Sequence, residues 1–247
     1  RAAEPSVAAT PERTHGQAPG ARIGAVVVAA GSSRRMGGVD KIFAPVLGSP
    51  LIARAMEAFE AFRPVAEIVL VLDEDSLGQG WDLVRRQGYR KVSCICAGGP
   101  RRQDSVQRGL ESLTPCDWVI VHDGARPCLD QRMLRRGLEA AQETGAAAAG
   151  VPVKDTIKLV SSENVVVATP PRDRLWAAQT PQVFRYSLLW DAHARGTETV
   201  TDDAALVERL GCPVKMFLGS YENLKVTTLE DLAVAEGFLR SRAGVPI

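Results

Sequence analysis

Apolar residues recur along this chain in two alternating patterns. Short runs of small and β-branched residues, such as 23–30, are typical of strands buried on both faces of a parallel sheet. Longer segments such as 50–62 carry Leu51, Ala55 and Phe59 at helical spacing and predict helices. We expect strands at 23–30, 67–72, 92–96, 118–122 and 146–153, and helices at 50–62, 77–87, 104–113 and 129–144.

The order of these segments predicts the fold class. Strands that alternate with helices form an α/β protein with an open, doubly wound, mostly parallel Rossmann-like sheet and right-handed crossovers. Such sheets bind ligands at the carboxyl ends of their strands. The turn at Gly31 and the loop at Asp123 both follow predicted strands, so we expect binding residues at these two places.

The pattern changes after residue 153. Two short apolar runs flank the polar residues 161–164, which predicts a β-hairpin arm over about 154–170 that projects from the domain. Such an arm serves dimerisation or is an edge hairpin without a partner, and both interpretations stay open. Helices at 185–195, 202–210 and 229–240 and a strand at 214–218 complete the pattern.

Composition predicts the domain boundaries. Residues 1–22 are rich in Ala, Pro, Thr and Glu and have neither an apolar core nor helical periodicity, so we expect a disordered leader. Residues 23–243 are expected to form a single domain, because no repeat or inner linker divides them. The sequence contains no window of about 18 apolar residues, so no membrane helix is expected.

Charge and cysteine content narrow the functional classes. Thirty Lys and Arg residues against 29 Asp and Glu residues give a net charge of +1, so no overall field points to nucleic acid or a membrane. The five cysteines are odd in number, and Cys94-Ile95-Cys96 is one residue too short for a redox or zinc pair. We expect the thiols of Cys94 and Cys96 on opposite faces of a strand. Reduced thiols predict a cytoplasmic protein.

Candidate chemistry begins at the end of the first strand. The small residues Ala29-Ala30-Gly31 let backbone N–H groups approach phosphate oxygens, and Arg34, Arg35 and Lys41 follow this turn closely. Guanidinium and ammonium groups offset the charge of a polyphosphate. The pattern indicates a phosphate site, although basic turns without a ligand also follow strands.

Two further loops follow predicted strands. In 122–127 the Asp123 carboxylate suits a ribose hydroxyl or a metal-bound phosphate, and a structural ion pair with Arg126 in a turn is the alternative. In 98–106 the glycines let a flat base approach the backbone and Ser105 can hydrogen-bond its edge. A plain loop before a helix explains that segment equally well.

The acidic pairs and the histidines do not predict a metal site or a nucleophile. Residues 73–75 and 202–203 are expected in first turns of helices, where carboxylates interact favourably with the dipole, with Thr201 as an N-cap. His122 and His193 have no second ligand at useful spacing, so neither zinc nor a histidine-dependent triad is expected. We therefore assign no protein ligand to a metal.

Six blocks of the chain match one family in that family's order. They are 29–41, 98–106, 122–127, 153–156, 172–184 and 219–231, and the last contains Asn223-Leu224-Lys225-Val226-Thr227. From residue 23 to residue 240 the chain resembles the 2-C-methyl-D-erythritol 4-phosphate cytidylyltransferases of the non-mevalonate isoprenoid pathway. These enzymes have a Rossmann-like fold of the nucleotide-diphospho-sugar transferase type. Together the six blocks are specific for this family, although each is weak by itself.

The resemblance implies transfer of CMP from CTP to a sugar-alcohol phosphate, with release of pyrophosphate. It assigns catalytic roles to Arg35, Lys41, Arg172 and Lys225. It places the nucleotide against Ala29, Ala30, Gly31, Ser33, Gly99, Ser105, Asp123 and Gly124. It places the acceptor against Asp123, Arg126, Thr156, Arg172, Thr180, Thr201 and Lys225. It also implies Mg²⁺ held mainly by the triphosphate, and a homodimer in which the hairpin clasps the partner and Arg172 reaches the other subunit's site.

Two positions depart from the family pattern. Four residues, 37–40, separate Met36 from Lys41 where the family usually has five, and Pro100 stands where some members carry Asp. Two alternatives stay open: a ribitol 5-phosphate cytidylyltransferase, and a non-catalytic nucleotide-binding protein of the same fold. Leu175-Trp176 resembles the methylerythritol branch, and the presence of all four catalytic groups disfavours a non-catalytic protein.

Overall fold

The computed structural model describes residues 20–31, 41–196 and 198–244. A seven-stranded sheet contains β1 (Ile23–Val28), β4 (Val65–Leu72), β5 (Val92–Ala97), β6 (Trp118–Asp123), β7 (Ala146–Pro152), β10 (Trp176–Arg185) and β11 (Lys215–Leu218). Two short pairs lie outside it, β2 (Pro45–Val46) with β3 (Ser49–Pro50) and β8 (Leu159–Val160) with β9 (Val166–Ala168). The helices are α1 (Leu51–Ala61), α2 (Leu77–Gln87), α3 (Arg102–Ser112), α4 (Gln131–Thr144), α5 (Tyr186–Arg195), α6 (Asp203–Arg209) and α7 (Leu229–Arg242). The predicted α/β class is confirmed.

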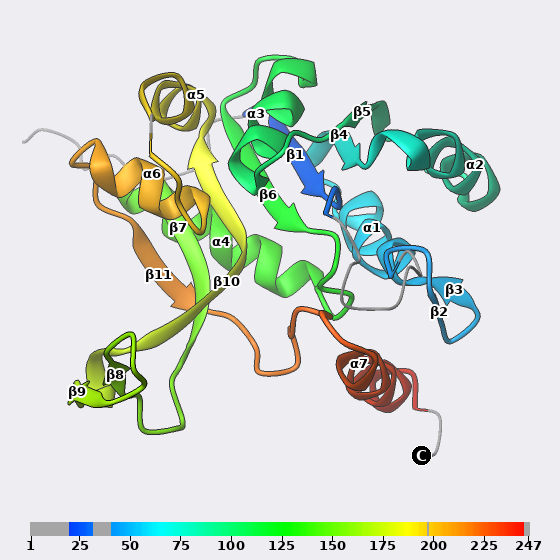
Figure 1. The fold of residues 1–247 in the computed structure, drawn as a ribbon. Helices are drawn as coiled ribbons and strands as arrows, with labels where there is room; N and C mark the ends of the chain where they lie inside the picture. The colour runs from blue at the N-terminus through cyan, green and yellow to red at the C-terminus, as the bar shows by residue number, and fades with distance from the viewer. Residues whose placement is uncertain (1–19, 32–40, 197, 245–247) are drawn as a thin grey trace, which may run out of the picture.

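The sheet reverses its order next to β1. The strands lie in the order β11-β7-β10-β6-β1-β4-β5 (Figure 1). β1 pairs in parallel with both β4 and β6, so the chain first runs outward through β4 and β5 and then returns to add β6 on the other side. Val28 and Asp123 are register partners at this point, which brings the ends of β1 and β6 together. Open α/β sheets bind their ligands at such a reversal.

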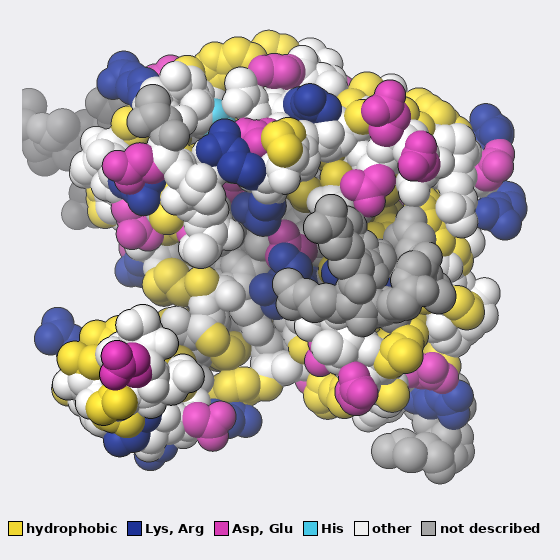
Figure 2. All heavy atoms as spheres, in the orientation of Figure 1, with side chains coloured by type: hydrophobic (Ala, Val, Ile, Leu, Met, Phe, Trp, Pro, Cys, Tyr) yellow, Lys and Arg dark blue, Asp and Glu magenta, His cyan; other side chains and the backbone are white. Residues whose placement is uncertain are grey.

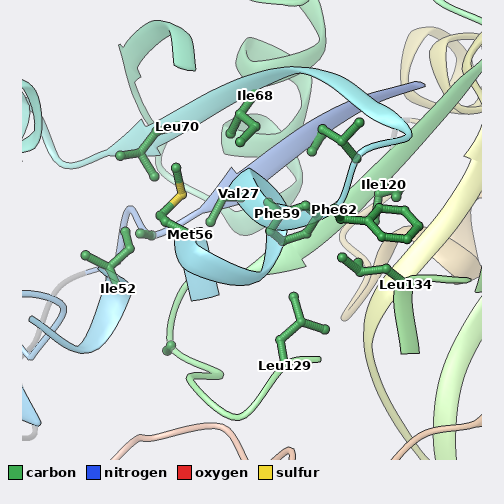
Figure 3. Close-up of a cluster of buried hydrophobic side chains, with 14 of the residues drawn as sticks. Val27, Ile52, Met56, Phe59, Phe62, Ile68, Leu70, Ile120, Leu129 and Leu134 are labelled. Carbon is green, nitrogen blue, oxygen red and sulfur yellow. The ribbon is translucent and has the colours of Figure 1, made fainter. Parts of the chain in front are cut away.

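Both faces of the sheet are covered by helices. Ala25 and Val27 of β1 belong to a buried cluster with residues of α1, α2, α4 and α7, part of which is drawn in Figure 3. Val26 and Val28 belong to a second cluster with residues of α3, α5 and α6. Successive side chains of a strand point to opposite faces, so burial on both faces requires a continuous apolar run. This explains the sequence of β1.

One long strand was not predicted. β10 lies antiparallel between β6 and β7, whereas the sequence pattern indicated no strand over 176–185. Gln179, Thr180, Pro181 and Gln182 interrupt the apolar pattern there and resemble a loop. In the structure the three polar side chains are buried, and the pairing with β7 shifts register in this stretch. Tertiary contacts therefore satisfy the buried polar groups of a stretch that resembles a loop in the sequence.

The predicted hairpin arm is present. β8 and β9 pair antiparallel and project away from the main sheet (Figure 1). Its apolar side chains are uncovered, and Leu159 and Val167 are 59% and 65% exposed. The arm therefore buries little apolar surface within its own chain.

Two local expectations were wrong. The N-cap of α6 is Asp202, whose carboxylate accepts a hydrogen bond from the backbone N–H of Ala205, and not Thr201. Cys94 and Cys96 both pack against the same hydrophobic cluster, because residues two apart in a strand share a face. All five cysteines are free thiols. Within the described ranges, no helix is long and apolar enough to cross a membrane.

Candidate active site

Two adjoining cavities lie at the ends of β1 and β6. The first, of about 130 Å³, is lined by six of the predicted residues: Ala29, Ala30, Gly31, Lys41, Asp123 and Lys225. The second, of about 170 Å³, brings in Arg126, Thr180 and Thr201. Arg102, Asp123 and Lys225 line both cavities, so these residues form the boundary between them. Figure 2 shows Lys and Arg side chains gathered near the centre of this face.

A larger cavity lies elsewhere and has a different character. It measures about 610 Å³ and is lined by residues of α1, α7 and the segment after β6, including Arg54, Asp130 and Arg242. It contains none of the predicted site residues. The smaller pair of cavities is the better candidate, because it lies at the reversal of the sheet and contains the predicted site residues.

Asp123 is the charged centre of the site. Its carboxylate is 5% exposed and contacts Arg102 Nε through Oδ1 at 3.0 Å. Its Oδ2 lies 3.0 Å from Lys225 Nζ and 3.5 Å from Arg126 Nε. Burial alone would raise the pKa of Asp123, but the charges of Arg102, Lys225 and Arg126 outweigh it and hold the pKa well below its usual range. Asp123 is therefore ionised at neutral pH.

A chain of hydrogen bonds fixes the backbone behind Asp123. His122 Nε2 lies 3.2 Å from the carbonyl oxygen of Arg126, which can only accept, so Nε2 carries the proton. Nδ1 then accepts from the Thr180 hydroxyl at 3.0 Å, and that hydroxyl oxygen accepts from the backbone N–H of Asp123, also at 3.0 Å. Burial lowers the pKa of His122 to about 4, which keeps the imidazole neutral. Thr180 thus holds Asp123 in place while it lines the second cavity.

The predicted nucleotide loop packs against the first cavity. The Gly99 N–H donates to Ser105 Oγ at 3.0 Å, so this hydroxyl holds the loop. A Cβ atom added at Gly98 would overlap the Cβ of Ala30, so the close approach of the two loops requires glycine. Gly124 likewise lies against Ala29, and its N–H donates to the carbonyl of Val28 at 2.8 Å. Gly99 and Ser105 therefore support the cavity wall rather than line it.

Arg172 and Thr156 line neither cavity. Arg172 is exposed and donates to the Lys154 carbonyl at 2.7 Å, at the base of the arm. Thr156 is exposed on the segment that leads into the arm. Ser33 and Arg35 lie outside the described residues.

The sequence analysis missed Arg102, which lines both cavities and bonds to Asp123. It is the first residue of α3, where the positive end of the helix dipole disfavours a cation. An arginine in that position therefore indicates a strong acidic partner or an anionic ligand. This signal was present in Arg101-Arg102 after the Gly98-Gly99 loop.

Comparison with known proteins identifies the family. The family model described as 2-C-methyl-D-erythritol 4-phosphate cytidylyltransferase (IspD) matches residues 23–241. The chain belongs to this family. A member of that name from Dehalococcoides mccartyi is 50% identical over 219 residues, which are 89% of this chain and 96% of the relative. Another from Alkaliphilus metalliredigens is 44% identical over 228 residues, which cover 90% of this chain and 94% of the relative.

Solved structures of the cytidylyltransferase family share the fold. The 4-diphosphocytidyl-2C-methyl-D-erythritol synthase of Anaerococcus prevotii superposes with a TM-score of 0.79 at 28% identity, covering 89% of this chain and 99% of that structure. The 2-C-methyl-D-erythritol 4-phosphate cytidylyltransferase of Thermus thermophilus gives 0.69 at 33% identity, covering 87% and 98%. The resemblance stated from the sequence is thereby confirmed.

Proposed function

We infer that this protein is an enzyme that transfers CMP from CTP to 2-C-methyl-D-erythritol 4-phosphate and releases pyrophosphate. Membership of the family supports the activity. The observation that carries it at the site is the buried Asp123 carboxylate, held by Arg102, Arg126 and Lys225 at the boundary of two cavities. Two adjoining cationic cavities suit a reaction that must bring two phosphate-bearing molecules together.

We propose that the first cavity takes the nucleotide and the second takes the acceptor. The backbone of Ala29, Ala30 and Gly31 would contact the cytidine and its phosphates, with Ser33 and Gly124 nearby, and the loop at Gly99 and Ser105 would support this wall of the cavity. Arg126, Thr180 and Thr201 would contact the acceptor, with Thr156 nearby. Asp123 lies between the two and suits a ribose hydroxyl.

The reaction is an in-line displacement at phosphorus. An oxygen of the acceptor phosphate attacks the α-phosphorus of CTP, a new P–O bond forms, and the bond to pyrophosphate breaks. Lys41 and Arg35 would stabilise the negative charge that develops in the transition state. Lys225 and Arg172 would hold the acceptor phosphate in line. Catalysis is therefore mainly a matter of position and charge.

We propose that Mg²⁺ enters with the triphosphate. Among the described residues no three His, Cys, Asp or Glu side chains are grouped as metal ligands. Asp123 is already neutralised by three cations. Mg²⁺ commonly keeps water and binds through substrate phosphates, so these residues fit an ion that the nucleotide carries. It would supply further charge neutralisation on the phosphates.

We also propose a homodimer whose subunits share their active sites. The arm exposes six large apolar side chains: Ile157, Leu159, Val160, Val165, Val166 and Val167. Such a patch favours a protein partner, and a second copy of this chain is the simplest one. Arg172 lies at the base of the arm, outside the cavities of its own chain, which fits a role in the other subunit's site. Five free thiols favour a cytoplasmic location.

A pyrophosphate-release assay tests this function. CTP with 2-C-methyl-D-erythritol 4-phosphate should give stoichiometric pyrophosphate, and CTP with ribitol 5-phosphate should give far less. Faster turnover with ribitol 5-phosphate would assign the enzyme to the other branch. Tight CTP binding without turnover on either acceptor would contradict catalysis.

A further inference from the structure

A buried ionic chain extends from the site into the second layer of helices. Arg102 Nε donates to Asp123 Oδ1 at 3.0 Å, and Arg102 Nη1 donates to Asp203 Oδ2 at 2.7 Å. The other oxygen of Asp203 lies 3.2 Å from His193 Nε2. Asp203 is completely buried, so its charge requires these partners. The guanidinium of Arg102 is therefore held between a carboxylate on β6 and a carboxylate on α6.

The outer end of this chain is itself firmly anchored. Gln182 of β10 accepts from the Ala204 N–H at 3.1 Å through Oε1 and donates to the Asp202 carboxylate at 2.8 Å through Nε2. These bonds fix the first turn of α6, which carries Asp203. A planar guanidinium with two directed bonds has little rotational freedom, unlike a lysine ammonium. Arg102 is thus fixed by two separate elements.

The inner end of the chain leads to Lys225. Arg102 bonds to Oδ1 of Asp123, whereas Lys225 contacts Oδ2. A rotation of the Asp123 carboxylate would therefore move both contacts together. Lys225 is 40% exposed in its side chain and lines both cavities, so its ammonium can meet an anionic ligand.

We propose that Arg102 is a positioning residue for the transfer reaction. Anchored by Asp203, it fixes the orientation of the Asp123 carboxylate, which in turn holds Lys225 at the boundary where the two phosphates meet. The inference rests on the proposed function. It assigns a role to Arg102, Asp203 and His193 that depends on geometry rather than on direct contact with a substrate.

The principal test is Arg102→Gln, which removes the charge and one of the two directed bonds. Misplacement of Lys225 should lower kcat about ten- to a hundredfold while the KM for CTP changes little. Arg102→Lys keeps the charge and should recover part of the loss. The matched control is Arg22→Gln, because Arg22 pairs with the buried Glu67 at 2.6 Å at the opposite, amino end of β1. This control should lose stability but keep its turnover per folded molecule.

Two further variants keep the test decisive. Asp203→Asn retains the shape of the side chain and should lower kcat without unfolding the protein, so it replaces Arg102→Gln if that variant does not fold. In the double variant Arg102→Gln with Lys225→Gln, the fold-loss in kcat should be smaller than the product of the two single losses, because both substitutions act on the position of the Lys225 ammonium. Multiplicative losses, or unchanged kcat in folded Arg102→Gln and Asp203→Asn, would overturn the inference. An inactive wild-type enzyme would instead overturn the proposed function, and the inference with it.

Discussion

His122 has both ring nitrogens occupied and is completely buried beside the charged Asp123. Its fixed partners require the neutral ring with the proton on Nε2. A protonated ring would place a second donor against the Thr180 hydroxyl, which already accepts from the Asp123 N–H. Protonation would therefore remove the bond from the Thr180 hydroxyl to Nδ1 and place a positive charge in a buried site that already holds Arg126 and Arg102.

We expect His122 to make stability depend on pH. Its pKa is lowered to about 4 in the folded protein from 6.5, so between these values the unfolded chain binds more protons. Stability should therefore fall as the pH is lowered through this window, by at most about 1.4 kcal/mol per pH unit from this group. Urea unfolding at several pH values measures it.

The control for this prediction is His122→Gln, which cannot titrate. Its slope of stability against pH in the same window should be smaller than that of the wild type. Equal slopes would mean that other groups cause the dependence. If the variant does not fold, the ring proton signals of His122 in the wild type should still show a neutral imidazole at pH values well below the usual pKa of 6.5.

At the scale of single residues, the sequence predicted Asp123 and two of its cationic partners but not the residues that hold this carboxylate in position. The family resemblance placed Asp123, Arg126 and Lys225 together in the site, and the structure brings both cations to the Asp123 carboxylate. Arg102 and Asp203 were not assigned to the site, since their roles depend on contacts between residues 101 positions apart. The cation at the start of the helix indicates an acidic partner or an anion, but no local pattern shows that the partner is Asp203.

The loops at the ends of β1 and β5 act as one element. Gly98 lies so close to Ala30 that a side chain cannot be accommodated without movement of one loop. Ser105 holds the same loop through its bonds to Gly99, so the loop has little freedom to give way.

Gly98→Ala should therefore disturb the first cavity, which we propose binds the nucleotide. We expect a loss of about 1–3 kcal/mol in stability from overpacking. The KM for CTP should rise more, relative to the wild type, than the KM for the acceptor. Gly78→Ala is the matched control, because an added Cβ on α2 meets nothing within 4 Å. That variant should fold and bind CTP as the wild type does. A Gly98→Ala enzyme with unchanged CTP affinity would contradict a role for this contact.

Helices and strands were predicted well wherever apolar residues form a continuous run or recur at helical spacing. The predicted helix 77–87 agrees with α2, and the parallel strands differ from their predicted bounds by at most two residues. β10 was missed because its buried polar residues are satisfied by partners distant in sequence, such as Asn223 and Asp202. A strand that carries binding residues loses the apolar pattern by which strands are found.

At the scale of the whole molecule, the predicted catalytic groups that the structure describes lie in two places. Lys41 and Lys225 line the cavities, whereas Arg172 lies at the base of the arm. The proposed dimer would join them across subunits. Each site would then contain Lys41 of one chain and Arg172 of its partner.

Mixed dimers of two inactive variants test this arrangement. Lys41→Ala and Arg172→Ala should each be severely impaired alone, by about a hundredfold for the lysine. After subunit exchange, half of the dimers should be mixed and each should hold one intact site, which restores about a quarter of the wild-type sites. Absence of recovery in dimers confirmed as mixed would contradict shared sites. Lys41→Ala mixed with itself is the control.

The position of β10 also determines the order in which the strands of the sheet can pair during synthesis. β6 and β7 follow each other in sequence, yet both pair with β10, which is synthesised after them. The half of the sheet formed by β5, β4, β1 and β6 needs only residues up to 123. A nascent chain that ends before residue 176 therefore leaves one edge of β6 and both edges of β7 unpaired, because β11 also follows β10, and unpaired edges favour aggregation. Because Thr180 and Gln182 of β10 line the second cavity, such a chain has the residues of β1 and β6 that line the first cavity before it has the β10 wall of the second.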